Sequence, residues 1–368
     1  MALFGSPNSY IGVDLGTSTS KIVELLDRKR RVELTTYAES NNRNILVNPP
    51  SGNQEAIDAT VVALRAMMDR AGTVSDSAIA ALPGGVVFST VLMLPRIPEA
   101  EMEQAVRFAA RDVVPADIDE MVLGWSRVGS QPHMATDTVP IKSGNEEEQA
   151  AQGDGPVPVF ITAAPKDVVD RYIAVFEKLQ MSLLSLEVET FPLVRSLLTP
   201  GAPATLLVDI GSRATTFHII DGGIPRVSHT IDFGGYDVTK SLASSLNISE
   251  EEAEEAKVSL GIGDEQDEDT RTAILQLIER QSGKAKDLLE LYERKESKKI
   301  SKAILIGGGA NLKGLCAHWE KEFSLQAVVG NPWKGLSYPG KLEGVLTDIG
   351  PRFGVAVGLA LRGFAQVP

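Results

Sequence analysis

Residues 11–21 read IGVDLGTSTSK and decide the fold. An apolar, β-branched run reaches Asp14, and a turn of small residues follows before a second β-branched run begins. This order predicts a β-hairpin with a polar tip at residues 16–20. Residues 206–215, LLVDIGSRAT, repeat the pattern, and Asp209 stands 195 positions (209 − 14) after Asp14. A repeat of domain length predicts two related α/β units rather than a solenoid of short repeats.

An Asp-x-Gly-Thr/Ser turn at the end of a strand suits a phosphate and a cation. The backbone N–H groups of such a turn point outward and hold phosphate oxygens, while the carboxylate holds Mg²⁺ through water. We therefore expect Asp14 and Asp209 to face one metal–nucleotide unit from two sides, and Lys21 to contact a phosphate oxygen. One such turn alone is an ordinary hairpin tip, and a strand lysine alone is usually solvated. The repeat favours the nucleotide site.

Two further segments match the same chemistry. Residues 303–309 read as a buried strand that runs into three glycines, which let backbone approach a flat adenine or ribose closely. A Ser-x-x-Glu capping box at Ser249 predicts a helix on which Glu254 and Lys257 share one face. The simpler explanations are a tight strand-to-helix turn and a solvated helix face. The predicted nucleotide-binding residues are Asp14, Gly16, Thr17, Ser18, Lys21, Asp209, Gly211, Ser212, Thr215, Gly235, Glu254, Lys257, Gly307, Gly308 and Gly309, with Asp14 and Asp209 as the metal ligands.

The composition argues against several functional classes. The chain has 368 residues, which predicts two or more domains, and a formal net charge of −13, the wrong sign for binding nucleic acid. Cys316 is the only cysteine, so neither an internal disulfide nor a Cys-based zinc site can form, as is usual in a reducing cytosol. The sequence predicts neither a signal peptide nor a membrane-spanning helix. We expect no nucleic-acid partner and no direct membrane insertion.

The periodicity of apolar residues predicts the other elements. Helices are expected at residues 54–71, 99–113, 166–180, 191–198 and 270–296, and a pair of strands around 79–82 and 86–94. The polar, Gly/Pro-rich residues 129–158 predict a disordered surface loop. The second of these helices carries one apolar face, which either binds a partner or forms the core of its own subdomain. That face consists of Met102, Val106, Ala109 and Val113.

These motifs resemble those of the actin-like ATPase superfamily, which includes actin, DnaK-type chaperones, sugar kinases and the cell-division protein FtsA. Its first and second phosphate motifs, its adenosine motif and its closing connecting helix are similar to residues 11–24, 206–219, 304–312 and 351–360. Within the superfamily the chain resembles the PilM family of cytoplasmic type IV pilus assembly proteins. That resemblance lies in residues 11–25, 94–128, 163–194 and 253–257.

The resemblance implies a duplicated ribonuclease H-like fold with two lobes, residues 1–200 and 201–368. The first lobe would contain an inserted small α+β subdomain at about 77–163 that binds a partner, and the second a helical subdomain at about 240–300. ATP and Mg²⁺ would lie between the lobes, with at most slow hydrolysis. The implied partner is the cytoplasmic tail of the membrane protein PilN, which would hold the chain at the inner membrane; self-association is a further expectation.

Two residues depart from the superfamily pattern or stay unassigned. Arg213 in the second phosphate turn is bulkier than the small residues usual there, and Glu189 is too weakly indicated to be assigned as the residue that polarises water. Three alternatives stay open. They are an FtsA-like filament protein that binds membrane, a GspL-like type II secretion component, and a sugar or acetate kinase, for which no catalytic base is found in the first lobe.

Overall fold

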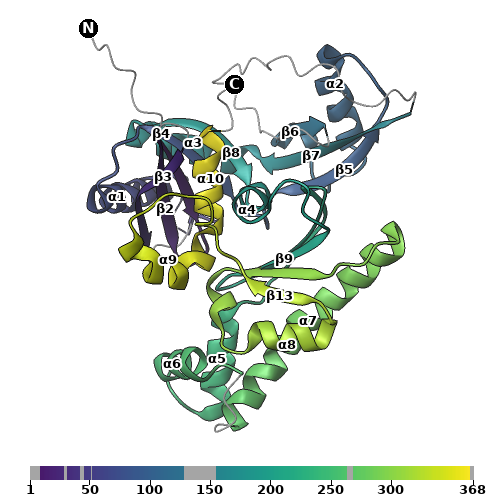
Figure 1. The fold of residues 1–368 in the computed structure, drawn as a ribbon. Helices are drawn as coiled ribbons and strands as arrows, with labels where there is room; N and C mark the ends of the chain where they lie inside the picture. The colour runs from purple at the N-terminus through teal and green to yellow at the C-terminus, as the bar shows by residue number, and fades with distance from the viewer. Residues whose placement is uncertain are drawn as a thin grey trace.

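The structure, a computed structural model, describes residues 9–28, 31–41, 45–50, 52–127, 155–262 and 268–364. Its strands form two five-stranded sheets and one three-stranded sheet. Each large sheet lies in one lobe, and Figure 1 shows the two lobes one above the other with the small sheet beside the first.

The first large sheet has the order β3-β2-β1-β4-β8. Its strands are β1 (Ser9–Leu15), β2 (Ser20–Arg28), β3 (Arg31–Ser40), β4 (Ser77–Leu82) and β8 (Ser182–Val188). The second has the order β11-β10-β9-β12-β13. Its strands are β9 (Thr205–Ile210), β10 (Thr215–Asp221), β11 (Ile224–Ile231), β12 (Lys302–Ile306) and β13 (Gln326–Val329).

The two sheets repeat one topology. In each, three consecutive strands pair antiparallel and two later strands join in parallel, so that β9 corresponds to β1. Asp14 and Asp209 therefore occupy equivalent places, one residue before the end of β1 and of β9. This arrangement confirms the duplicated two-lobed fold that the sequence repeat predicts.

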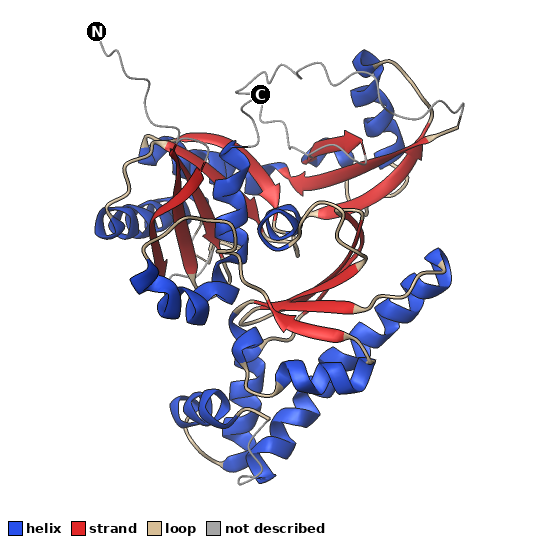
Figure 2. Ribbon diagram, in the orientation of Figure 1, coloured by secondary structure: helices blue, strands red, loops and turns tan. Residues whose placement is uncertain are grey.

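Helices cover both faces of each sheet (Figure 2). On the first lobe, α1 (Asn53–Ala71) and α3 (Lys166–Leu179) bury Leu64, Tyr172 and Phe176 against the strands. On the second lobe, α5 (Gly235–Leu246), α6 (Glu250–Leu260), α7 (Glu268–Glu296) and α8 (Leu315–Phe323) enclose a core around Phe217 and Trp319. Each lobe thus has a hydrophobic core of its own.

A shared layer lies between the two sheets. It consists of α4 (Thr190–Leu197) and α10 (Gly354–Phe364), whose Leu193, Val355 and Leu359 pack with residues of β4, β9 and β12. Two short elements, α9 (Glu343–Ile349) and the 3₁₀ turn η4 (Gly350–Phe353), precede α10. Within the described ranges one stretch, residues 340–364, is long and apolar enough to span a membrane, and 61% of its apolar window is buried, as expected of a core segment.

Small residues let α10 approach its neighbours closely. A Cβ at Gly358 would overlap the backbone of Pro192 in α4, and one at Gly12 would overlap the carbonyl oxygen of Ala356. Buried charges add to this contact, because the Glu187 carboxylate lies 3.1 Å from both Arg195 and Arg362, and Arg195 donates to the Gly358 carbonyl at 2.6 Å. The closing helix is therefore held by β8 and α4 together.

The small sheet forms the inserted subdomain, and it corrects two predictions. It has the order β5-β7-β6, with β5 (Phe88–Leu94), β6 (Met121–Arg127) and β7 (Val157–Pro165). The strands around 79–82 and 86–94 are thus not a pair, since β4 lies in the first large sheet and β5 pairs with β7. Residues 157–158, expected in the surface loop, belong to β7, whereas 128–154 lie outside the described residues.

The helix of the inserted subdomain, α2 (Glu99–Ala110), is shorter than predicted. Its buried residues Met102, Val106 and Ala110 form the subdomain core with Ile161. Ala109 is only partly buried, and Val113 lies beyond the end of the helix and is partly exposed. Met102 and Val106 of the predicted apolar face are therefore core, and they cannot be the surface that receives a partner.

Candidate functional site

The first phosphate turn lies between β1 and β2. Asp14 stands opposite Lys21 in the antiparallel register, with the Lys21 Nζ 3.8 Å from Asp14 Oδ2. The Gly16 N–H donates to the Thr19 carbonyl at 3.0 Å, and a Cβ at Gly16 would lie only 2.7 Å from that oxygen. Glycine is therefore required for so tight a turn, whose tip exposes Thr17 and half-buries Ser18.

The Asp14 carboxyl is buried near the end of its strand. The residue lies in β1, not in the turn, and is only 6% exposed. Removal from water raises the pKa of Asp14, and Lys21 counteracts this effect. A substitution at this position therefore acts on a buried ion pair.

The second phosphate turn, between β9 and β10, has the same construction. The Gly211 N–H donates to the Ala214 carbonyl at 2.9 Å, as Gly16 does to Thr19. Ser212 is half-buried beside it. Thr215 is fully buried, donates to the Phe233 carbonyl at 2.8 Å and accepts from Gln281 at 2.9 Å. Thr215 thus stabilises the turn from the interior of the lobe. Its buried hydroxyl is bonded to protein groups, and its contact with nucleotide stays a prediction.

The glycine run follows β12 and lies against the second turn. Gly307 has a φ of 82°, and a Cβ on it would lie 2.5 Å from the Asp209 Oδ1. A Cβ on Gly309 would overlap the side chain of Ile210, whereas Gly308 is more open. The third motif is therefore in direct contact with the second.

The helix α6, which carries Glu254 and Lys257, is connected to the second phosphate turn through α5. The Gly235 N–H donates to the Gly211 carbonyl at 2.9 Å. Lys257 donates to the Gly235 carbonyl at 3.0 Å, to Thr239 at 2.8 Å and to Glu254 at 2.6 Å. Glu254 and Lys257 therefore share a face, and Lys257 reaches the carbonyl of Gly235, which is itself bonded to the second phosphate turn.

Carboxylates from the two lobes influence one another electrostatically. Removal from water and the nearby charge of Asp14 raise the pKa of Asp209 to about 6. Glu189, directly after β8 and before α4, accepts the Gly84 N–H at 3.0 Å. Burial, then the charges of Asp14 and Asp209, raise the pKa of Glu189 to about 8. The two expected metal ligands thus face one region, and a third carboxyl group faces it with them.

The sequence reasoning left Glu189 unassigned and missed Glu39 and Arg352. Glu189 follows the carboxyl end of a strand parallel to β4 and β1, and such strand ends gather at the ligand-binding edge of α/β sheets. Glu189 could have been identified in this way only with the order of the strands in the sheet known. Glu39 stands opposite Lys21 in the register of β2 and β3, and its carboxylate pairs with Arg352 of η4 at 3.0 Å. Opposite charges therefore alternate along the row Arg352, Glu39, Lys21 and Asp14.

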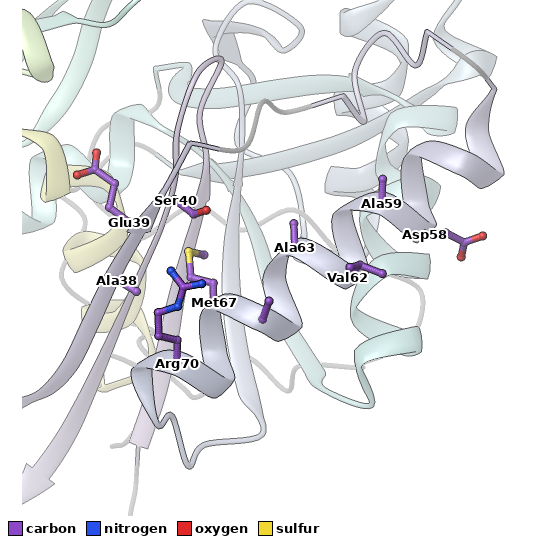
Figure 3. Close-up of a pocket in the computed structure, with 10 residues that line it drawn as sticks. Ala38, Glu39, Ser40, Asp58, Ala59, Val62, Ala63, Met67 and Arg70 are labelled. Atoms are coloured by element: carbon purple, nitrogen blue, oxygen red, sulfur yellow. The ribbon is translucent and has the colours of Figure 1, made fainter.

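A hollow of about 580 Å³ lies between α1 and β3 (Figure 3). Ala38, Glu39 and Ser40 line it from the strand, and Ala63, Met67 and Arg70 are among its residues from the helix. Among its lining residues, Glu39 belongs to the row of charges described above. This hollow is distinct from the phosphate turns.

No group of three or more His, Cys, Asp or Glu side chains among the described residues is arranged to hold a bare metal ion. Asp14 and Asp209 nevertheless lie close enough to Glu189 for their charges to raise its pKa, and the charge of Asp14 also raises the pKa of Asp209. The arrangement suits a cation that keeps part of its water shell and takes its other ligands from phosphate oxygens.

Comparison with solved structures shows the same fold. A chain of a PilM–PilN type IV pilus biogenesis complex superposes with a TM-score of 0.78 at 24% identity, covering 98% of this chain and 99% of that one. The ethanolamine utilization protein EutJ of Carboxydothermus hydrogenoformans gives 0.55 at 16% identity, covering 97% and 90%. MreB 5 of Spiroplasma citri bound to AMPPNP gives 0.52 at 13% identity, covering 96% and 95%. The fold is that of the actin-like ATPases.

Comparison of sequences is consistent with that fold. The cell division protein FtsA of Enterococcus faecalis is 23% identical over 266 residues, which are 68% of this chain and 57% of FtsA. The chain therefore spans little more than half of that relative. The family model of the type IV pilus assembly protein PilM matches residues 12–364. Because this match covers nearly the whole sequence, the chain belongs to the type IV pilus assembly protein PilM family.

Proposed function

We propose that this chain is a nucleotide-binding scaffold of type IV pilus assembly whose two lobes hold Mg²⁺ and ATP between them. The observation that carries the proposal is the meeting of Asp14 and Asp209, which come from two duplicated turns: the charge of Asp14 raises the pKa of Asp209, and both charges raise the pKa of Glu189. MreB 5, which shares the fold, was solved with AMPPNP. A single hairpin tip would not need a matching carboxylate from the other lobe.

The residues present fit a nucleotide. The tight turns at Gly16 and Gly211 leave backbone N–H groups for phosphate oxygens, and Gly307 removes the Cβ that would otherwise press on Asp209. Lys21 would contact a phosphate, and Glu254 with Lys257 would contact the ribose and base. A bound Mg²⁺ would neutralise phosphate charge, and Asp14 and Asp209 would hold its water ligands.

We further propose that the chain lies in the cytoplasm and binds the cytoplasmic tail of a PilN-type membrane protein, since the similar structure is a PilM–PilN complex. Met102 and Val106 are buried and cannot make this contact. Among the described residues of the inserted subdomain, the most exposed large apolar side chains are Phe108, which is 71% exposed on α2, and Met93, which is 59% exposed on β5. They are the candidates for receiving the tail.

The nucleotide site is tested by calorimetric titration of the chain with ATP and Mg²⁺. Asp14→Asn keeps the volume of the buried side chain and should weaken binding roughly 10- to 100-fold, the usual cost of losing a group that holds a metal's water or ligand. Asp170→Asn, at an exposed position on α3, is the matched control and should bind as the original chain does. Equal affinity of the Asp14 variant and the original chain would remove Asp14 from the site.

A further inference from the structure

Arg213 is an exposed cation in the second phosphate turn. Its guanidinium carbon lies 4.7 Å from the centroid of the Tyr236 ring, a cation–π contact. No ion pair joins Arg213 to a carboxylate in the part of the chain that the structure describes. The side chain is therefore held next to the turn by an aromatic face alone.

Backbone hydrogen bonds place Tyr236 beside the turn. The Tyr236 N–H donates to the Ser212 carbonyl at 2.7 Å, and the Gly235 N–H donates to the Gly211 carbonyl at 2.9 Å. These bonds hold the backbone of Tyr236 against the turn, where its ring contacts the Arg213 guanidinium.

Arg213 is a cation of the second phosphate turn that has no carboxylate partner among the described residues, so it can bind a phosphate in addition to the proposed contact of Lys21. Three carboxyl groups, Asp14, Asp209 and Glu189, face the region. Lys21 is paired with Asp14 at 3.8 Å and Lys257 with Glu254 at 2.6 Å. The phosphates of a nucleoside triphosphate would bring negative charge into this acidic region. A nucleoside diphosphate, which lacks the terminal phosphate, would bring less negative charge. A guanidinium binds phosphate through two parallel hydrogen bonds, which an exposed cation–π contact does not match in strength.

We propose that Arg213 recognises the terminal phosphate of a nucleoside triphosphate, leaving the Tyr236 ring to bind it. The inference rests on the proposed nucleotide-binding function and specifies which nucleotide state the chain prefers. It also accounts for the presence of a large cation in a turn that is otherwise built of small residues.

The test compares AMPPNP with ADP, both with Mg²⁺, by calorimetry on the full chain. Arg213→Gln should weaken AMPPNP binding about tenfold, the loss typical of a charged hydrogen bond, and change ADP binding less than about twofold. Arg213→Lys should lose less AMPPNP affinity, because it keeps the charge without the planar fork. Arg226→Gln, which removes the same charge from an exposed position on β11, should leave both affinities unchanged.

The outcomes separate the two proposals. If Arg213→Gln weakens AMPPNP and ADP equally, or weakens neither, Arg213 does not read the terminal phosphate, although the chain still binds nucleotide. If the original chain binds neither nucleotide, the proposed function fails and this inference fails with it. A loss of AMPPNP affinity as large in the Arg226 variant would show a general effect of net charge and would also overturn the inference.

Discussion

The surroundings of Glu189 determine its charge near neutral pH. Its ordinary pKa of 4.5 rises to about 8 because the group is buried and faces Asp14 and Asp209. In this pH interval the folded chain holds a proton that the unfolded chain has released. The free energy of unfolding therefore falls as pH rises from about 4.5 to about 8, since the folded state binds more protons.

Glu189→Gln should remove this dependence. Glutamine cannot ionise and still offers an oxygen to the Gly84 N–H, so the variant should be more stable than the original chain at pH 8 by the order of 1–3 kcal/mol. The advantage should disappear near pH 4.5. Thermal unfolding at several pH values measures it, with the exposed Glu279→Gln of α7 as the control. A stability difference that does not change with pH would show that Glu189 keeps an ordinary pKa.

At the scale of single elements, α10 depends on its glycines. The helix crosses the backbone of α4 at Gly358, where a Cβ has no space. Both lobes pack on this layer, so displacement of α10 would disturb β1 as well as β12. Overpacking of a buried helix contact costs about 1–3 kcal/mol and occasionally more.

Gly358→Ala should therefore destabilise the chain by about 3 kcal/mol, despite the higher helix propensity of alanine. Gly344→Ala in α9 is the matched control, because Gly344 is exposed and a Cβ there would meet nothing within 4 Å. That variant should be neutral or up to about 1 kcal/mol more stable. Denaturant unfolding compares the two. Equal stability of both variants would mean that α10 and α4 do not pack as closely as described.

Elements that depend on neighbouring residues can be predicted from the sequence, whereas pairings between distant strands cannot. The capping box at Ser249 is local, and α6 begins at Glu250 with reciprocal bonds between Ser249 and Glu252. The two phosphate hairpins are also set by neighbouring residues. The partner of β5 was not predictable, because β7 lies more than sixty residues further along the chain and both strands are short apolar runs with no mark of pairing. Glu189 and the Glu39–Arg352 pair depend on strand order and register in the same way.

At the scale of the whole molecule, the inserted subdomain is the proposed binding site for the PilN tail. A labelled peptide of the PilN cytoplasmic tail should bind the chain saturably. Phe108→Ser should weaken that binding about tenfold, because exposed aromatic residues often dominate such contacts. Val62→Ser, at a 69% exposed position on α1, is the control and should bind the tail normally. Fluorescence anisotropy with and without Mg–ATP measures both, and absence of saturable binding in either condition would disprove the PilN proposal.

The hydrogen bond between Gly84 and Glu189 connects the region of the phosphate turns to the inserted subdomain. Gly84 belongs to the short connection, residues 83–87, through which the chain leaves β4 for the inserted subdomain. The Glu189 carboxyl group, whose pKa is raised by both Asp14 and Asp209, is thus hydrogen-bonded to the stem of the subdomain. If a ligand at the phosphate turns displaced Glu189, this hydrogen bond would carry the displacement to that stem, and thermodynamic linkage would make any influence between the two places mutual.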